Sequence, residues 1–179
     1  MRDRLQLLSE LPFADGKPKA AVLVPLFEDD FSELRVLLIK RPDTMPTHAG
    51  HIAFPGGRPD PGDRDPIHTA LRETHEEVGI PEDEVEVIGF LPVIDTVEFP
   101  ILVHPVVGTF DRGVTIQPSP REVIRVHTPR LADLAMADRW VYETWRDHKV
   151  WFYDLDGDML WGATARMVRG LVGLDPLDG

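Results

Sequence analysis

Short apolar runs rich in Val, Ile and Leu recur along the chain, separated by polar stretches that contain Pro and Gly, a pattern typical of strands joined by turns. These runs predict strands at Ala20–Phe27, Leu34–Ile39, Val85–Ile94, Ile101–Phe110, Val123–Val126, Trp140–Thr144 and Val150–Leu155, and a further strand that ends at Phe54. After the strand Val150–Leu155, the Asp156-Gly157 pair predicts a tight hairpin turn.

A helical period replaces the strand pattern after residue 65. Asp65 is a favoured N-cap residue, proline follows it at the first helical position, and Gly79 ends the pattern, so a helix is predicted over Pro66–Val78. Two more helices are predicted near Pro129–Met136 and Gly162–Leu171. Many strands with few helices indicate an α/β protein, in which helices cover a mixed β-sheet to give an α/β/α sandwich.

At about 100° per residue, the helix that follows Asp65 separates into an apolar side and an acidic side. Measured from Glu73, the apolar stripe covers roughly 60° to 160°. The stripe contains Ile67, Ala70, Leu71, Thr74 and Val78. Glu76 and Glu77 fall at about −60° and 40° on the same scale. The three glutamates therefore form one patch beside the stripe that we expect to be buried.

This patch is unfavourable for an isolated helix, because like charges at these spacings repel and negative charge opposes the dipole in the second half of a helix. A bound cation would offset the cost. Clustered carboxylates suit Mg²⁺ or Mn²⁺, and three of them suggest more than one ion. Arg72 lies one turn before Glu76 and can orient or partly neutralise the patch. The alternative is a solvated acidic helix face.

Composition and charge limit the remaining possibilities. With 179 residues, the chain is expected to form one domain over residues 1–179, with an N-terminal extension at 1–19. The absence of Cys, of a signal peptide and of a membrane-spanning run predicts a cytoplasmic protein with no membrane partner. A net charge of −12 argues against nucleic-acid binding. The aromatic residues expected in the core or at a homodimer interface are Trp140, Trp145, Trp151, Phe152 and Trp161.

The segment RETHEEVGI, preceded by Gly57, resembles the box GX5EX7REUXEEXGU of the Nudix hydrolases. The matching residues are Arg72, Glu73, Glu76, Glu77, Gly79 and Ile80, whereas Thr74 replaces an apolar residue. Gly57 lies one residue too far upstream, and Arg64 occupies the position of the first box glutamate. Asp63 and Asp65 flank Arg64, and either can substitute for that glutamate. The resemblance implies the Nudix fold.

A second segment, LLIKRPDTMPTHAGHIAFPGG, resembles the signature LLTXRSX3RX3GX3FPGG of coenzyme A pyrophosphatases within that family. It departs from the signature at Ile39, Pro42 and Pro46, and Pro46 replaces an arginine that could contact an anionic substrate. The resemblance implies hydrolysis of coenzyme A to 3′,5′-ADP and 4′-phosphopantetheine. The alternatives are another small-molecule nucleotide substrate, such as ADP-ribose, a dinucleotide or a nucleoside triphosphate, or a non-catalytic nucleotide-binding module.

The resemblance also implies roles for residues in the box. Glu76 and Glu77 are expected to bind metal, and Glu73 either binds metal or takes the proton from water as general base. Gly56-Gly57 is expected to form a turn that lets the backbone come close to the substrate, with the Gly56 carbonyl as a further metal ligand. A simple tight turn is the alternative.

Other candidates lie outside the box. Glu122 is a further catalytic candidate, or else a surface glutamate. Arg41 and Arg58 are the basic residues nearest the motif loops and could bind substrate phosphates, or form surface ion pairs. His48 and His51 lack a third nitrogen or sulfur ligand nearby in the sequence, so loop or strand-end roles are favoured over a transition-metal site.

Overall fold

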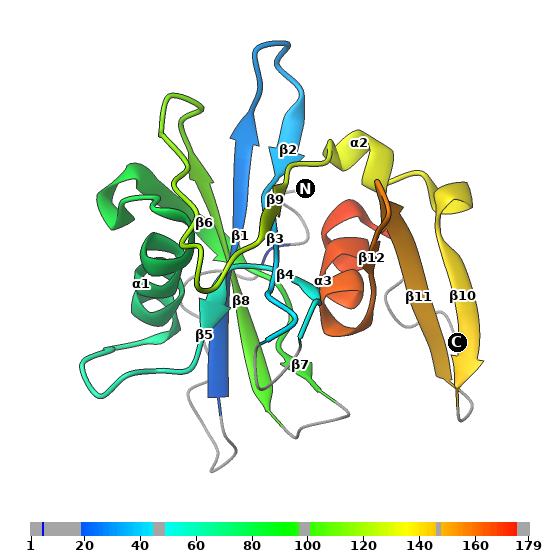
Figure 1. The fold of residues 1–179 in the computed structure, drawn as a ribbon, viewed down its shortest axis with the longest axis horizontal. Coiled ribbons are helices and arrows are strands. Elements are labelled where there is room, and N and C mark those ends of the chain that lie inside the picture. The colour runs from blue at the N-terminus through cyan, green and yellow to red at the C-terminus, as the bar shows by residue number, and fades with distance from the viewer. Residues whose placement is uncertain (1–4, 6–18, 45–48, 97–100, 146–147, 175–179) are drawn as a thin grey trace.

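The computed structural model describes residues 5, 19–44, 49–96, 101–145 and 148–174 (Figure 1). Its strands are β1 Lys19–Glu28, β2 Leu34–Val36, β3 Leu38–Lys40, β4 Ile52–Ala53, β5 Gly56–Gly57, β6 Val85–Phe90, β7 Ile94–Asp95, β8 Leu102–Phe110, β9 Arg125–His127, β10 Val141–Trp145, β11 His148–Leu155 and β12 Asp158–Leu160. Its α-helices are α1 Pro66–Val78, α2 Leu131–Leu134 and α3 Gly162–Val172, and short 3-10 helices are η3 Glu82–Glu84 and η4 Ala137–Arg139.

The centre of the fold is a mixed sheet with the strand order β2-β1-β8-β6, in which β5 also pairs with β1 and β7 with β8. β1 and β8 run parallel over eight residue pairs, and the other pairs of this sheet are antiparallel. A parallel pair requires a long crossover, and here the crossover contains the whole segment from β2 to β7. The middle of β1 is fully buried at Leu23, Val24 and Leu26.

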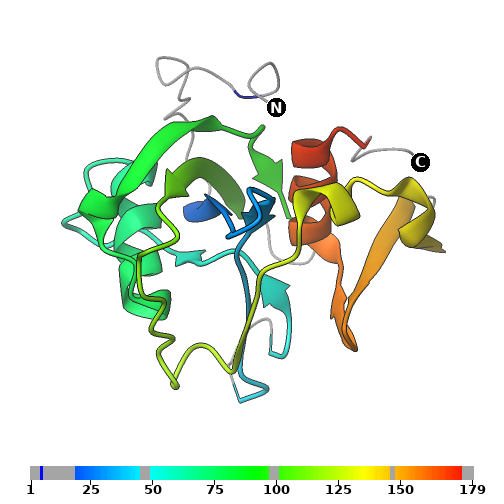
Figure 2. The ribbon, with the colours of Figure 1, turned by 90° about the horizontal axis from the view of Figure 1, so that it is seen from above.

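Two further sheets have the strand orders β4-β3-β9 and β10-β11-β12. Figures 1 and 2 show α1 on one side of the sheets and α3 on the other, with the β10–β11 hairpin outside α3. The predicted mixed sheet with helices on both sides is therefore confirmed. The predicted hairpin turn is also confirmed, because Asp156 and Gly157 connect β11 to β12 and both have positive φ, 53° and 90°.

The predicted limits of α1 agree with its caps. The Asp65 side chain accepts a hydrogen bond from the backbone N–H of His68 at 2.8 Å. Gly79 adopts the left-handed conformation, and its N–H donates to the His75 carbonyl at 2.9 Å. Ala70 packs in a buried cluster with β1, β6 and β8, against which Ile67 is partly buried, so the apolar stripe faces the sheet as expected.

Gly56-Gly57 was expected to be a turn, and this prediction is wrong. The two residues form β5, in which Gly57 pairs with Ala21 and Gly56 with Val22 of β1. A Cβ atom on Gly56, whose φ is 152°, would overlap the Ala21 carbonyl oxygen and Val22. The lack of side chains thus allows a close strand pairing here rather than a reversal of the chain.

Several predicted limits also differ from the structure, and the expected strand Leu34–Ile39 divides into β2 and β3. The expected strand Val85–Ile94 divides into β6 and β7, and Pro92, which has no N–H to donate, lies between them. β9 begins two residues later than predicted, because the N–H of Val123 donates to Ser119 in a turn instead of a ladder. The expected helix Pro129–Met136 is shorter, and α2 covers only its middle.

Candidate functional site

Glu77 lies inside the protein, with only 2% of its surface exposed, and not at the edge of the buried stripe as predicted. Its Oε2 accepts a hydrogen bond from the Gly56 N–H at 2.9 Å, and its Oε1 lies 3.3 Å from the guanidinium of Arg41. Burial raises the pKa of Glu77 to about 7, although the Gly56 hydrogen bond and the Arg41 charge oppose the rise. A buried acid that titrates near neutrality indicates a functional site.

Arg72 connects the other two box glutamates with the loop before α1. Its guanidinium lies 3.0 Å from Glu73 Oε1 and 3.2 Å from Glu76 Oε1. It also binds both oxygens of Asp63, at 3.1 and 3.0 Å, and donates to the Arg58 carbonyl at 3.2 Å. These hydrogen bonds, with that to Asp63 the strongest, raise the pKa of Arg72 above its usual range. Arg72 therefore contacts both glutamates, and its role in orienting or partly neutralising them stays a prediction.

Of the two aspartates beside Arg64, the structure brings only Asp63 to Arg72. The Asp63 carboxylate is buried and also accepts hydrogen bonds from the Asp60 N–H at 2.9 Å and the Thr69 hydroxyl at 2.8 Å. The Arg72 hydrogen bonds hold the pKa of Asp63 far below its usual range. Asp65 instead caps α1. Of the two aspartates, Asp63 is thus the one that contacts the box arginine, and its substitution for the missing glutamate stays a prediction.

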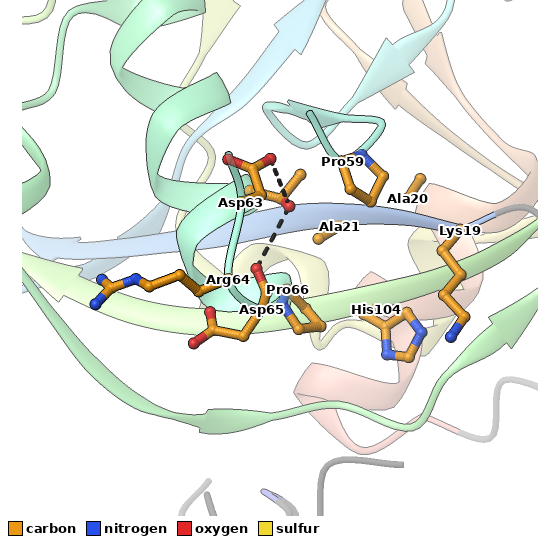
Figure 3. Close-up of a pocket in the computed structure, with 10 residues that line it drawn as sticks. Lys19, Ala20, Ala21, Pro59, Asp63, Arg64, Asp65, Pro66 and His104 are labelled. Atoms are coloured by element: carbon orange, nitrogen blue, oxygen red, sulfur yellow. Dashed lines mark hydrogen bonds between the residues drawn. The ribbon is translucent and has the colours of Figure 1, made fainter. Parts of the chain in front are cut away.

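A small cavity of about 70 Å³ lies beside this loop, between the start of α1 and strands β1 and β8 (Figure 3). Asp63 and His104 are among its lining residues, whereas Glu73, Glu76 and Glu77 are not. The volume is well below the several hundred Å³ of a typical small-molecule site. This cavity is therefore not the nucleotide pocket.

Gly57 of β5 and Glu73 of α1 are in close contact. A Cβ atom on Gly57 would lie 2.6 Å from the carboxyl carbon of Glu73, so only glycine fits there without displacing the carboxylate. Burial raises the pKa of Glu73, and the charges of Glu76 and Glu122 act in the same direction against the Arg72 hydrogen bond. Glu73 therefore lies in a partly dry environment with excess negative charge.

Glu122 lies in the loop before β9, and its catalytic role stays a prediction. Its charge raises the pKa of both Glu73 and Glu77, which requires it to be near them. The backbone explains this position, because the Ser119 N–H donates to the Glu77 carbonyl at 2.8 Å and the Glu122 N–H donates to the Ser119 carbonyl at 3.0 Å. The loop before β9 is therefore fixed to the end of α1.

Four carboxylates of this group repel one another: the charges of Glu76 and Glu122 raise the pKa of Glu73, and the charges of Glu73 and Glu122 raise the pKa of Glu77. Such a group fits a divalent cation. Within the described ranges, however, no three His, Asp or Glu side chains already form a metal site. Arg72, Arg41 and the Gly56 N–H occupy the carboxylate oxygens instead. Gly56 reaches Glu77 through its N–H, and its carbonyl as a metal ligand stays a prediction.

The two arginine candidates, Arg41 and Arg58, differ in how close their side chains lie to the glutamates. Arg41 lies at the site through its contact with Glu77, whereas Arg58 is exposed and meets the site through its backbone carbonyl. Phosphate binding by either arginine stays a prediction. His48 and Pro46 fall outside the described residues.

One polar cluster was missed by the sequence reasoning. Asp158 of β12 is buried and faces Lys40, Arg125 and His127 of strands β3 and β9. The sequence of the segment that contains Asp158 predicts only a hairpin turn. Asp158 pairs with the buried Leu155, and alternation along β12 puts Asp158 on the same face as the buried Leu160. This alternation of buried and exposed positions is the sequence signal for a buried Asp158.

Comparisons with known proteins agree with this geometry. The NUDIX domain family matches residues 17–148 of the chain. A relative from Photorhabdus laumondii subsp. laumondii, the uncharacterized Nudix hydrolase NudL, is 35% identical over 162 residues, which cover 88% of this chain and 85% of the relative. No helix within the described part of the chain is long and apolar enough to cross a membrane.

Solved structures show the same fold. The MutT/nudix family protein from Enterococcus faecalis is similar with a TM-score of 0.61 at 18% identity, covering 94% of this chain and 69% of that one. The Ap4A hydrolase of C. elegans, in a binary complex, is similar with a TM-score of 0.54 at 25% identity, covering 68% of this chain and 86% of that one.

Proposed function

Because this chain belongs to the Nudix hydrolases, enzymes that cleave pyrophosphate bonds in nucleotide-linked molecules, we propose that it hydrolyses coenzyme A or a coenzyme A derivative with Mg²⁺ or Mn²⁺. The products would be 3′,5′-ADP and 4′-phosphopantetheine. The observation that carries the proposal is the group of carboxylates formed by Glu73, Glu76, Glu77 and Glu122, whose mutual repulsion a divalent cation would offset.

The coenzyme A part of the proposal rests on the signature segment Leu37–Gly57. Its described residues form β3, β4 and β5, and β5 contacts Glu77 through the Gly56 N–H. Arg41, which matches the first arginine of the signature, also contacts Glu77. The residues that resemble the coenzyme A signature are therefore next to the residues that resemble the Nudix box. A substrate held by the first group would present its diphosphate to the second.

In the proposed reaction, water attacks one phosphorus of the diphosphate, a new P–O bond forms, and the bond from that phosphorus to the bridging oxygen breaks. A divalent cation at the site would neutralise the diphosphate and make water more acidic. Glu76 and Glu77 would hold it, and Glu73 would either share in this or accept the proton of water. Arg72 keeps the carboxylates of Glu73 and Glu76 in place, and Arg41 adds positive charge for a phosphate oxygen.

Location and assembly are part of the same proposal. The chain has no Cys, and this supports a cytoplasmic enzyme. Val141, Tyr142 and Trp145 of strand β10 are exposed, and this supports a homodimer that buries them.

A substrate panel tests the proposal. The protein is incubated with coenzyme A, ADP-ribose, a diadenosine polyphosphate and a nucleoside triphosphate, with and without Mg²⁺ or Mn²⁺, and the products are identified by mass. We expect metal-dependent release of 3′,5′-ADP and 4′-phosphopantetheine from coenzyme A at the highest rate. Faster hydrolysis of another member of the panel would reject coenzyme A as the substrate. Binding without hydrolysis of any member would favour a nucleotide-binding module.

A further inference from the structure

A cluster of cations surrounds Asp158 where β12 meets the β4-β3-β9 sheet. Lys40 Nζ donates to Asp158 Oδ1 at 2.6 Å, and an Nη atom of Arg125 donates to Oδ2 at 2.9 Å. The Nε2 atom of His127 lies 3.0 Å from the same Oδ2. Lys40 and Arg125 are opposite each other in the β3–β9 ladder, so their side chains lie on one face of it. Three donors from two strands therefore share one carboxylate.

The cluster has more positive charge and more donors than Asp158 can use. Two side chains of permanent positive charge face one carboxylate, and hydrogen bonding by Lys40 is the main reason that the pKa of Asp158 lies below its usual value. In the described structure, Arg125 uses one of its five N–H groups on a protein acceptor, and its side chain is 57% exposed. In a chain with a net charge of −12, this is a local site of positive charge with unused donors.

The cluster adjoins the carboxylate site through two strands. Lys40 is followed directly by Arg41, whose guanidinium contacts Glu77. Arg125 follows three residues after Glu122, and the Ile124 N–H donates to the Lys40 carbonyl at 3.0 Å. Arg41 thus lies directly after β3 and Glu122 shortly before β9, at the end of the small sheet where Lys40 pairs with Arg125.

We propose that Lys40 and Arg125 bind a phosphomonoester group that the substrate carries in addition to its diphosphate. This inference rests on the proposed function and specifies its substrate class, a nucleotide with a third phosphate. Asp158 orients the two donors, and the unused N–H groups of Arg125 bind the phosphate oxygens. The coenzyme A signature has an arginine where this chain has Pro46, and Lys40 and Arg125 supply positive charge in its place.

A purely structural ion pair would need only one cation for Asp158. Lys40 alone makes a 2.6 Å contact with it, and its side chain is mostly buried, so Lys40 satisfies the structural need. Arg125 is the more exposed partner, and an exposed ion pair contributes little to stability. Its role in the cluster is therefore better explained by a ligand than by folding.

The test compares coenzyme A with dephospho-coenzyme A, which lacks only the 3′-phosphomonoester. The ratio of kcat/KM for the two compounds is measured for the wild type, for Arg125→Gln and for Arg112→Gln as a matched control. Arg112 is also 57% exposed and also paired with an aspartate, Asp30, elsewhere on the surface. We expect Arg125→Gln to lower the ratio about tenfold by removing charge-assisted hydrogen bonds, and Arg112→Gln to leave the ratio at the wild-type value. An equal loss for both compounds in Arg125→Gln would show a structural role and overturn the proposal.

A binding measurement separates failure of this inference from failure of the proposed function. Calorimetry compares 3′,5′-ADP with 5′-AMP, without any turnover. If the wild type prefers 3′,5′-ADP and Arg125→Gln loses that preference, the phosphomonoester site stands even if coenzyme A is not hydrolysed. If coenzyme A is hydrolysed but the preference is absent or independent of Arg125, the phosphomonoester site is rejected and the proposed function is retained.

Discussion

The guanidinium of Arg72 binds both carboxylate oxygens of Asp63, at 3.1 and 3.0 Å, while it also holds Glu73 and Glu76. A pair with two parallel hydrogen bonds fixes the plane of the guanidinium, and Asp63 thereby determines where Arg72 places the two glutamates. The aspartate in the loop acts on the carboxylate site without belonging to it.

Asp63→Asn is therefore expected to lower activity about tenfold and to reduce the free energy of unfolding by about 2 kcal/mol, because a buried charged hydrogen bond is lost. Steady-state kinetics and urea unfolding measure the two effects. Asp60→Asn is the control, because Asp60 is 69% exposed and 3.9 Å from Arg72. Equal effects of the two substitutions would contradict the role of Asp63.

Gly57→Ala is expected to reduce activity strongly, because the new methyl group would overlap the carboxylate of Glu73. The stability should change little, because the overlapped atoms are the far end of a flexible side chain that can move aside. Kinetics and thermal unfolding check this. Gly62→Ala in the same loop is the control, since a Cβ there has no neighbour within 4 Å. A fully active Gly57→Ala enzyme would contradict the contact.

Glu76→Gln tests the cation site by two independent measurements. The side chain is 53% exposed, so the fold should persist, while turnover should fall by about 10²-fold or more. Mg²⁺ or Mn²⁺ should raise the melting temperature of the wild type, since a cation that binds only the folded state stabilises it by about 2.7 kcal/mol at 100 times Kd. The shift should be smaller in the variant. Absence of any shift in the wild type would support a merely solvated acidic face.

Asp158 predicts a dependence of stability on pH. Its pKa in the folded protein lies below the ordinary 3.8, so its ion pairs stabilise the protein fully above that value and are lost as pH falls through the lower folded pKa. Asp158→Asn should therefore cost about 2 kcal/mol at pH 7, and the difference from the wild type should shrink below pH 3.8. Urea unfolding at several pH values measures it. A difference that stays constant down to pH 2.5 would rule out the charge as the cause.

The elements with strong local signals could be predicted from the sequence. The caps of α1, the long strands β1 and β8 and the Asp156-Gly157 turn all depend on residues within a few positions of one another. The three box glutamates were also placed on one helix. The periodicity could not show that Glu77 is buried, because that depends on β5 and Arg41, which come from earlier in the chain.

The rest of the site depends on contacts between distant segments. Asp63 and Asp65 are equivalent in the sequence, and only the path of the loop shows that the first faces Arg72 and the second caps α1. Lys40 and Asp158 are 118 positions apart, so no spacing rule could join them. The sequence does not distinguish a turn from a strand at Gly56-Gly57, because glycine pairs are common both in turns and where two backbones lie unusually close.

The hydrogen bond from Gly56 to Glu77 ties the acid to a strand that rests on β1, the centre of the main sheet. Glu77 is thus held in place by backbone whose own position depends on the apolar interior beneath it. Substitutions in that interior, remote from any reacting atom, would then alter both folding stability and the pH at which Glu77 loses its proton. Natural variation in the sheet would consequently be constrained by the reaction as well as by packing.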